Sequence, residues 1–269
     1  MYFPRAAIAV LMIGLTGALA GVAVTSARAQ SPAVPAPSVQ APAAQAALQI
    51  VGASRPPYVI ERDGIGSGPA VELVQPLARA IGIDPTVRIL PFQRAVMALD
   101  QGGTLYPALL RTPQRESRYI WIGEVYADRA VFFTRRSAGT VGNLEAARQL
   151  PRISVMRGSE LQGMLKSFGL ENFETANSET DNARLLQASR IDGWFALRAV
   201  GRATWAELNF IQSELRASES FATLPFWIAA SPNLPKDTVN TLRAAYRAMR
   251  ADGRYRRIVA PLVALENPS

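Results

Sequence analysis

Residues 88–119 decide the fold, and they read RILPFQRAVMALDQGGTLYPALLRTPQRESRY. The pattern predicts a strand that ends at Leu90, a helix from Phe92 to Asp100 that stops at a glycine pair, and a strand from Tyr106 to Leu110. This second strand runs directly into a turn formed by residues 111–115. Because ligands of open parallel sheets bind beyond the carboxyl ends of the strands, we expect the turn to lie on a binding edge.

The turn carries residue types that bind anions. Thr112 is a good N-cap and Pro113 suits the first helical position, so the backbone amides behind them point at whatever lies in front. Arg111 and Arg115 add guanidinium groups, which bind carboxylates through two parallel hydrogen bonds. The alternative is a capped surface turn whose arginines are solvated or form salt bridges with acids such as Glu116.

The alternation of short strands and helices begins at Leu48 and predicts an α/β fold with mostly parallel sheets flanked by helices. Residues 152–211 repeat the pattern as a second unit. Two extended apolar segments, residues 129–135 and 221–230, fall between the units and are predicted to be two hinge crossings. We therefore predict a first lobe made of residues 48–130 and 226–269 and a second lobe made of residues 131–225.

The first 29 residues have the pattern of an export signal. Arg5 supplies the positive start, residues 6–24 the apolar core, and Ala27-Arg28-Ala29 the small-residue cleavage site. We expect cleavage after Ala29 and a periplasmic location. The alternative is an uncleaved anchor, since the apolar core is close to the roughly 20 residues that a membrane span needs. Residues 30–47 are almost only Ala, Pro, Gln, Ser and Val, which predicts a disordered linker.

The composition excludes several classes of chemistry. The chain contains no cysteine and no histidine. These absences exclude disulfides, a thiol nucleophile, and Ser-His-Asp or Cys-His catalysis, and they disfavour a zinc or copper site. The net charge of +8 comes from scattered arginines without an aromatic-basic ladder, so nucleic acid is not an expected partner. Binding without a cofactor is the function that the composition favours.

Six motifs resemble, in order, those of the periplasmic solute-binding proteins of family 3. They are Pro56-Pro57-Tyr58, residues 91–95 (PFQRA), 112–116 (TPQRE), 156–159 (MRGS), 189–192 (SRID) and 251–255 (ADGRY). The resemblance covers Leu48 to about Val263 and implies the two-lobed type II fold of the receptors of amino-acid ABC transporters. It also implies a monomer that captures a small solute and presents it to a membrane permease.

The resemblance and the residue chemistry together give the candidate ligand-binding residues. These are Tyr58, Glu72, Arg94, Arg111, Thr112, Arg115, Ser159 and Trp194. In the family, the arginine that Arg115 matches holds the ligand's carboxylate. Tyr58 and Trp194 offer aromatic faces for stacking, and core packing is the alternative for both.

The remaining candidates also have alternatives. Thr112 assists Arg115 or only caps the turn. Arg94 and Arg111 hold a second negative group, or they are solvated or ion-paired. Glu72 accepts a ligand donor or pairs with Arg94. Ser159 presents a helix N-terminus from the second lobe.

One departure from the family concerns the ligand. Amino-acid receptors of this family usually carry an acid a few residues past their Val-Asp pair, to hold the ligand's ammonium group. Here Ile191-Asp192 is followed by residues 194–198, which read WFALR. The departure predicts an anion, favoured by Arg198, in place of an ordinary α-amino acid. Asp192 is expected to be structural.

Two other functions stay open on the same scaffold. One is a sensory or accessory domain that binds a ligand or a partner protein without transport, which an uncleaved leader would favour. The other is a dehydratase-like enzyme, for which Glu72 or Asp192 would have to be the general acid.

The leader prediction can be checked by mass spectrometry. If the signal is removed, the intact mass of the exported protein should correspond to a chain that begins at Gln30. Recovery of the full-length chain from the membrane fraction would instead support the anchored alternative.

Overall fold

The structure is a computed structural model that describes residues 48–266. Its first part contains the elements β1 (Gln49–Gly52), β2 (Ile60–Arg62), β3 (Ile65–Ser67), α1 (Pro69–Ala80), β4 (Val87–Ile89), α2 (Phe92–Gln101), β5 (Thr104–Leu110), the 3-10 turn Pro113–Arg115 and β6 (Ile120–Arg135). The middle part contains the 3-10 turn Arg136–Ala138, α3 (Leu144–Arg148), β7 (Ile153–Met156), α4 (Glu160–Ser167), β8 (Phe173–Ala176), α5 (Glu179–Gln187), β9 (Gly193–Leu197) and α6 (Arg198–Glu207). The last part contains the 3-10 turn Gln212–Glu214, β10 (Leu215–Ala217), β11 (Ala222–Ala230), α7 (Lys236–Ala251) and α8 (Arg254–Ala264).

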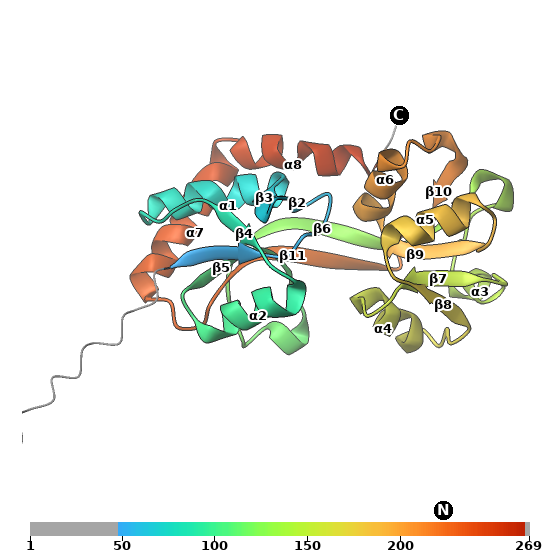
Figure 1. Cartoon of the computed structure of the whole chain (residues 1–269), viewed down its shortest axis with the longest axis horizontal. Helices are drawn as coiled ribbons and strands as arrows, with labels where there is room; N and C mark the ends of the chain where they lie inside the picture. The colour runs from blue at the N-terminus through green and yellow to red at the C-terminus, as the bar shows by residue number, and fades with distance from the viewer. Residues whose placement is uncertain (1–47, 267–269) are drawn as a thin grey trace, which may run out of the picture. The chain divides into compact units, whose positions relative to one another are not determined.

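The described strands form one mixed sheet in the order β2-β3-β4-β1-β5-β11-β6-β9-β7-β8, with β10 paired to β6. Strand β1 is parallel to β4 and β5, and β7 is parallel to β8 and β9. The long strands β6 and β11 run antiparallel between these two parallel groups and join them (Figure 1). We call β1–β5 with α1, α2, α7 and α8 the first lobe, and β7–β9 with α3–α6 the second.

The fold is therefore the predicted α/β, two-lobed type II arrangement, with one difference. The sheets of the two lobes are not separate, because β6 pairs with β9 of the second lobe and β11 pairs with β5 of the first. Ala130 pairs with Ala222 at the end of the β6–β11 ladder and with Leu197 of β9, so the first pairing passes to the second there. The exact lobe boundaries at residues 130 and 225 stay a prediction.

Most elements lie where the sequence pattern predicts them. Helix α1 spans residues 69–80, because Pro69 follows Gly68 and six apolar side chains of α1 are buried on one face. Residues 64–68 contain three glycines and read as a loop, but residues 65–67 form strand β3 of a hairpin. The turn that begins at Thr112 is also shorter than a capped helix, because its 3-10 helix has only three residues.

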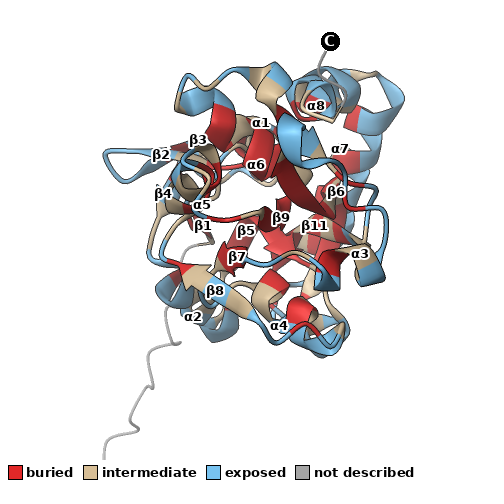
Figure 2. Cartoon of the chain, turned by 90° about the vertical axis from the view of Figure 1, so that its right-hand side faces the viewer, coloured by how far each residue is buried: buried red, intermediate tan, exposed pale blue. Residues whose placement is uncertain are grey.

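The helices cover both faces of the sheet, and the buried residues concentrate on the strands between them (Figure 2). Helices α1, α7 and α8 pack on one another in the first lobe, and α5 packs on α6 in the second. Within residues 48–266, no helix combines the length and apolarity that a bilayer crossing requires.

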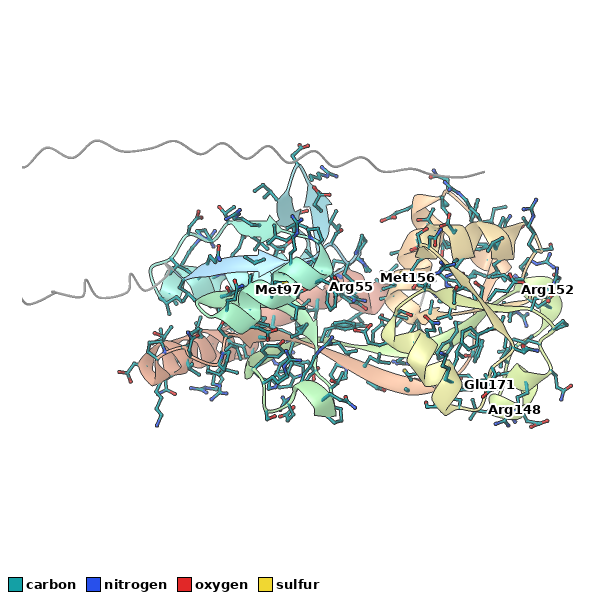
Figure 3. The ribbon with its side chains drawn as sticks, turned by 60° about the horizontal axis from the view of Figure 1, so that its bottom comes forward. Arg55, Met97, Arg148, Arg152, Met156 and Glu171 are labelled. Carbon is teal, nitrogen blue, oxygen red and sulfur yellow. The ribbon has the colours of Figure 1, made fainter. Side chains whose placement is uncertain are left out.

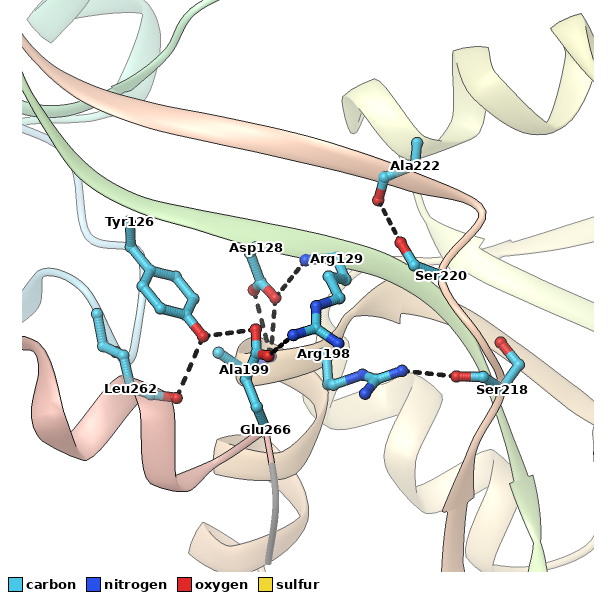
Figure 4. A network of polar contacts seen from close by, with 10 residues as sticks. All are labelled: Tyr126, Asp128, Arg129, Arg198, Ala199, Ser218, Ser220, Ala222, Leu262 and Glu266. Carbon is cyan, nitrogen blue, oxygen red and sulfur yellow. Dashed lines mark hydrogen bonds and ion pairs between the residues drawn. The ribbon is translucent and has the colours of Figure 1, made fainter.

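A buried carboxylate on β6 forms hydrogen bonds to both lobes at the centre of the fold. Asp128 is fully buried and accepts a hydrogen bond from the Tyr58 hydroxyl, which belongs to the first lobe. It also accepts hydrogen bonds from the backbone N–H of Ala199 at 3.2 Å, in the first turn of α6 in the second lobe (Figure 4). The carboxylate thus caps α6, whose own N-cap residue, Leu197, has no side chain that can do so.

A surface ion pair continues this connection. Arg129 pairs with Glu266, which also accepts a hydrogen bond of 2.6 Å from the Tyr126 hydroxyl (Figure 4). The residues that follow α8 are thereby fastened to β6 beside Asp128. Strand β6 therefore contacts the first lobe, through Tyr58 and Glu266, and the second lobe, through Ala199, within the four residues 126–129.

The pH dependence of stability tests the buried carboxylate. Burial raises the pKa of Asp128 above its ordinary value of 3.8, so the folded state binds more protons than the unfolded state just above that pH. This contribution is lost as the pH rises through the raised pKa. The free energy of unfolding of Asp128→Asn, measured by urea denaturation, should therefore increase relative to the wild type as the pH rises from 3.8.

Asp192→Asn is the matched control with the opposite sign. Two hydrogen bonds from Arg152, of 2.8 and 3.0 Å, lower the pKa of Asp192. Its stabilisation is present above pH 3.8 and is lost on acidification. The variant should lose stability relative to the wild type near neutral pH, and the difference should shrink in acid. The same sign for both variants would contradict the analysis of Asp128.

Packing of α7 on β6 depends on one glycine. A Cβ at Gly123 would lie 2.5 Å from the ring of Tyr246, whose hydroxyl donates a 2.6 Å hydrogen bond to the carbonyl of Glu124. Gly123→Ala should lower the free energy of unfolding by roughly 1–3 kcal/mol in urea denaturation, because the ring cannot move without losing that bond. Gly163→Ala in α4, where nothing lies within 4 Å of the added carbon, should not destabilise the protein.

Candidate functional site

The candidate site lies where the strands of both lobes end. From the first lobe it receives Arg55, which follows β1, Phe92, which follows β4, and Arg115, in the turn after β5. From the second lobe it receives Glu160 at the start of α4 and Glu179 at the start of α5. Parallel strands place their carboxyl ends on one edge, so each lobe presents its charged residues on a single side.

Arg115 lies in contact with the second lobe. Its guanidinium is 3.6 Å from the carboxylate of Glu160, and the two side chains are 20 % and 29 % exposed. The same group donates a 3.1 Å hydrogen bond to the carbonyl of Leu110 and lies 5.9 Å from the ring centroid of Phe92. The residue predicted to hold the ligand's carboxylate thus already has an acid of the chain beside it, supplied from the opposite lobe.

Arg111 contacts two tryptophan rings and an acid of its own lobe. Its guanidinium lies over the rings of Trp227 and Trp121, at 4.4 and 5.4 Å from their centroids. It also forms a two-pronged hydrogen bond with Glu116, and this bond lowers the pKa of Glu116. In this structure Arg111 is thus ion-paired, as the alternative to ligand binding predicts, and its role toward a ligand stays a prediction.

The two predicted helix caps differ. Thr112 precedes the three-residue 3-10 helix and makes no side-chain cap hydrogen bond. Ser159 caps α4, because its hydroxyl accepts from the N–H of Gln162 at 3.3 Å while it donates to the carbonyl of Met156 at 2.7 Å. The side chain of Gln162 in turn accepts from the N–H of Gly158, one residue before the N-cap. The hydroxyl of Ser159 thus forms its hydrogen bonds with the backbone of Met156 and Gln162.

Tyr58 and Trp194 lie in the core and offer no surface to a ligand in this conformation. Both are fully buried. The ring of Tyr58 stacks on Phe226 at 5.0 Å, and burial raises the pKa of its hydroxyl. Trp194 lies 5.2 Å from Phe133 and donates a 2.8 Å hydrogen bond to Glu179. Core packing, the alternative to ligand stacking, describes both residues in this structure, and stacking on a ligand stays a prediction.

Glu72 and Arg94 are exposed, in the first turns of α1 and α2. Within residues 48–266 neither forms an ion pair, so the predicted pairing of Glu72 with Arg94 is absent there. Arg198, expected to favour an anionic ligand, donates a 2.6 Å hydrogen bond to the carbonyl of Ser218 (Figure 4).

Three charged residues of the site were not predicted from the sequence: Arg55, Glu160 and Glu179. Arg55 is half-buried on the side of the first lobe that faces the second, where Figure 3 shows Met156 opposite it. Its guanidinium lies 5.5 Å from the ring centroid of Phe226. In the described part of the chain it forms neither an ion pair nor a side-chain hydrogen bond.

Glu179 is held by a chain of buried polar groups. One oxygen of its carboxylate accepts from the indole N–H of Trp194 at 2.8 Å and from the amide of Asn182 at 3.2 Å. The hydroxyl of Ser154 donates to that Asn182 side chain at 2.6 Å. Burial raises the pKa of Glu179, and the positive charge of Arg55 acts in the opposite direction.

Tyr106 lies among these charges on β5. Burial raises its pKa to about 12, while Arg55 and Arg115 lower it and Glu160 raises it by their charges. Three charged groups from both lobes therefore act on one buried hydroxyl. A pocket of about 360 Å³ opens beside them at the ends of β1 and β4, lined by Ala53, Ser54, Glu61, Ile89, Leu90, Pro91 and Phe92. No cluster of acidic side chains suited to a metal ion occurs within residues 48–266.

Solved structures share the fold at low sequence identity. A histidine kinase sensor domain with similarity to periplasmic binding proteins is 19 % identical with a TM-score of 0.67, over 80 % of this chain and 95 % of that one. The amino acid ABC transporter substrate-binding protein AbpA of Streptococcus pneumoniae, bound to L-arginine, is 14 % identical with a TM-score of 0.64, over 81 % and 95 %. The ancestral amino-acid-binding protein AncCDT-1, a precursor of cyclohexadienyl dehydratase, is 16 % identical with a TM-score of 0.64, over 80 % and 94 %.

At these identities the structures establish the fold alone. Among curated proteins, none matches the sequence. The family comparison is more informative, because residues 49–261 match the bacterial extracellular solute-binding proteins, family 3. The match spans both lobes and both crossings, and the chain belongs to this family of extracellular solute-binding proteins.

Proposed function

We propose that the protein is a periplasmic receptor that captures a small amino-acid-like or carboxylate-bearing solute between its lobes and presents it to an ABC-type transporter. Closure occurs about β6 and β11, the two strands that join the lobes. The observation that carries the proposal is the approach of Arg115 and Glu160, since a charged pair from opposite lobes at 3.6 Å marks the surface on which the lobes close. The receptor acts as a monomer and without a cofactor.

A sensory role is the second candidate. The similarity to a histidine kinase sensor domain favours it, because such a domain captures its ligand with the same fold. The two roles differ in the partner that recognises the closed, ligand-bound protein. For a transport receptor this partner is a permease, and for a sensor it is a membrane-bound signalling protein. An uncleaved leader would favour the sensor, and a released chain the receptor.

An enzymatic role has less support. Of the two acids available for proton transfer, Glu72 is exposed to solvent. Asp192 is bound by Arg152, which lowers its pKa and makes it a poor proton donor near neutral pH. We therefore propose binding without turnover, which the absence of product after prolonged incubation with a bound solute would support.

Calorimetry with purified protein tests the receptor function. A thermal-shift screen of amino acids and small carboxylates first identifies a ligand, since a ligand at a hundred times its Kd stabilises the folded state by about 2.7 kcal/mol. Arg115→Ala should then weaken binding by about tenfold to a few hundredfold, because a charge-assisted hydrogen bond is lost. The fold should stay intact.

Arg118→Ala is the matched control. Arg118 follows the same turn but pairs with Asp100 on the outer side of α2, so its loss should not change affinity. Unchanged affinity in a folded Arg115→Ala variant would show that Arg115 does not bind the ligand. Failure of every amino acid and carboxylate to stabilise the wild type would contradict the proposed function.

A further inference from the structure

The helices α7 and α8 of the first lobe carry a concentration of exposed arginines. We call them the arginine face, and they are Arg243, Arg247 and Arg250 of α7 and Arg254, Arg256 and Arg257 of α8. Residues 236–264 contain seven basic and two acidic residues, so they account for +5 of the chain's net charge of +8. More than half of the net positive charge is therefore carried by two neighbouring helices.

The arginine face lies apart from the candidate site. Helices α7 and α8 pack on each other and on α1, on one face of the sheet, whereas α2 covers the other face (Figure 1). Phe92 at the start of α2 lies against Arg115 in the candidate site. A partner bound to the arginine face would therefore not cover these two residues.

Few charges of the arginine face are neutralised within the described chain. Only Arg254 pairs with an acid there, since its guanidinium lies 2.7 Å from the carboxylate of Asp252. Arg243 and Arg250 donate hydrogen bonds of 3.0 and 3.4 Å to a backbone carbonyl and a tyrosine hydroxyl, which carry no charge. Within residues 48–266, neither an ion pair nor a side-chain hydrogen bond is formed by Arg247, Arg256 or Arg257.

Helix stability does not explain this placement of charge. Arg243, Arg247 and Arg250 follow one another at spacings of four and three residues, at which like charges destabilise a helix. The first turn of α8 contains arginines and no acid, although the positive end of a helix dipole favours acids. Both arrangements become favourable when an anionic partner lies against the helices.

The chemistry of the arginine face favours lipid phosphate groups as this partner. Six of the seven basic residues in residues 236–264 are arginine, whose guanidinium binds phosphate through two parallel hydrogen bonds. A protein partner would in addition need an apolar or aromatic anchor at the centre of the contact. The exposed large apolar residues of the described chain all lie outside residues 243–257. A layer of anionic head groups requires no such anchor. Nucleic acid also carries phosphates, but the chain belongs to an extracellular family.

We propose that the arginine face docks the first lobe on an anionic membrane surface by binding the phosphate groups of its lipids. Exposed charges attract such a surface without inserting into it, so the docking is peripheral and reversible. It holds the protein beside the membrane, where a permease or a signalling protein lies, while α2 and the candidate site face away from the lipid.

Cosedimentation with vesicles tests the docking. The purified exported protein should bind vesicles of equal parts phosphatidylglycerol and phosphatidylcholine more tightly than vesicles of phosphatidylcholine alone. The ratio of the two affinities is the readout, because an uncleaved leader would add to both. The ratio should fall to near one in about 0.5 M NaCl, since salt screens exposed charges.

A triple variant removes the arginines of the face that have no partner in the described chain. Its ratio should be about a hundredfold lower than that of the wild type, because each arginine near an anionic surface contributes about fivefold. The substitutions are Arg247→Gln, Arg256→Gln and Arg257→Gln.

The matched control removes the same charge from the second lobe, at three exposed arginines that form no ion pair in the described chain. Its ratio should stay within about threefold of the wild type, because charges that lie beyond the screening length from the lipid contribute little. The substitutions are Arg184→Gln, Arg190→Gln and Arg216→Gln. Thermal denaturation should show that both triple variants are folded.

Equal losses in the two triple variants would overturn the proposal, because the net charge of the whole chain would then drive binding. Equal binding of the wild type to both kinds of vesicle would also overturn it, and would leave an acidic protein as the partner of the arginine face. Solute affinity, measured by calorimetry, should be the same in both triple variants and the wild type. A wild type that binds no solute but prefers anionic vesicles would contradict the proposed function and support the docking.

Discussion

The buried carboxylate of Asp128 is the constraint on which the rest of the structure depends. A carboxylate without water is stable only if donors surround it, and here the donors are the Tyr58 hydroxyl and the N–H groups of Arg129 and Ala199. These donors belong to the first lobe, the crossing strand and the second lobe. Any rotation of one lobe relative to the other has to preserve or exchange these hydrogen bonds. Asp128 is therefore the pivot that we infer for the proposed lobe closure.

The lobes are also joined by the sheet itself. Strands β6 and β11 pair with each other over residues 120–130 and 222–230, and their register shifts twice, near Phe226 and Ile228. Irregular pairing bends and twists a strand pair more readily than a regular ladder. The connection is thus continuous in hydrogen bonding but locally deformable. These shifts lie beside Tyr58 and Phe226, so a change in strand twist would be felt at the pivot and at Arg55.

The sequence predicts the elements well where one strong local signal is present. Helix α1 follows from Pro69 and a one-sided apolar pattern, and the strands that precede the site follow from short apolar runs ended by Gly or Pro. The β2–β3 hairpin was missed because its two strands have only three residues each and its glycines indicate a loop. Short strands are stabilised by pairing partners that are distant in sequence, and a local pattern does not contain them.

The sequence predicts only part of the site, because the other site residues are brought together by contacts between distant segments. Arg115 belongs to a recognisable turn, and the structure places it facing the second lobe. Glu160 and Glu179 each follow a capping serine, where an acid is ordinary because it interacts with the helix dipole. Only tertiary structure shows that Glu160 lies opposite Arg115 and that Glu179 binds the indole of Trp194. Conversely, Tyr58 and Trp194 have side chains suited to stacking, but their burial depends on Phe226 and Phe133, from distant strands.

The attachment of Glu266 to Tyr126 and Arg129 has a practical consequence for reporting on ligand capture. This residue comes from the end of the chain that follows α8, yet it is bonded beside the pivot carboxylate, on the strand that links the lobes (Figure 4). A change in strand twist would therefore be transmitted to Glu266 and, through it, to helix α8 on the first lobe. A fluorophore attached to an exposed position of α8, such as Val263, would thus report on ligand capture as a biosensor without contacting the ligand.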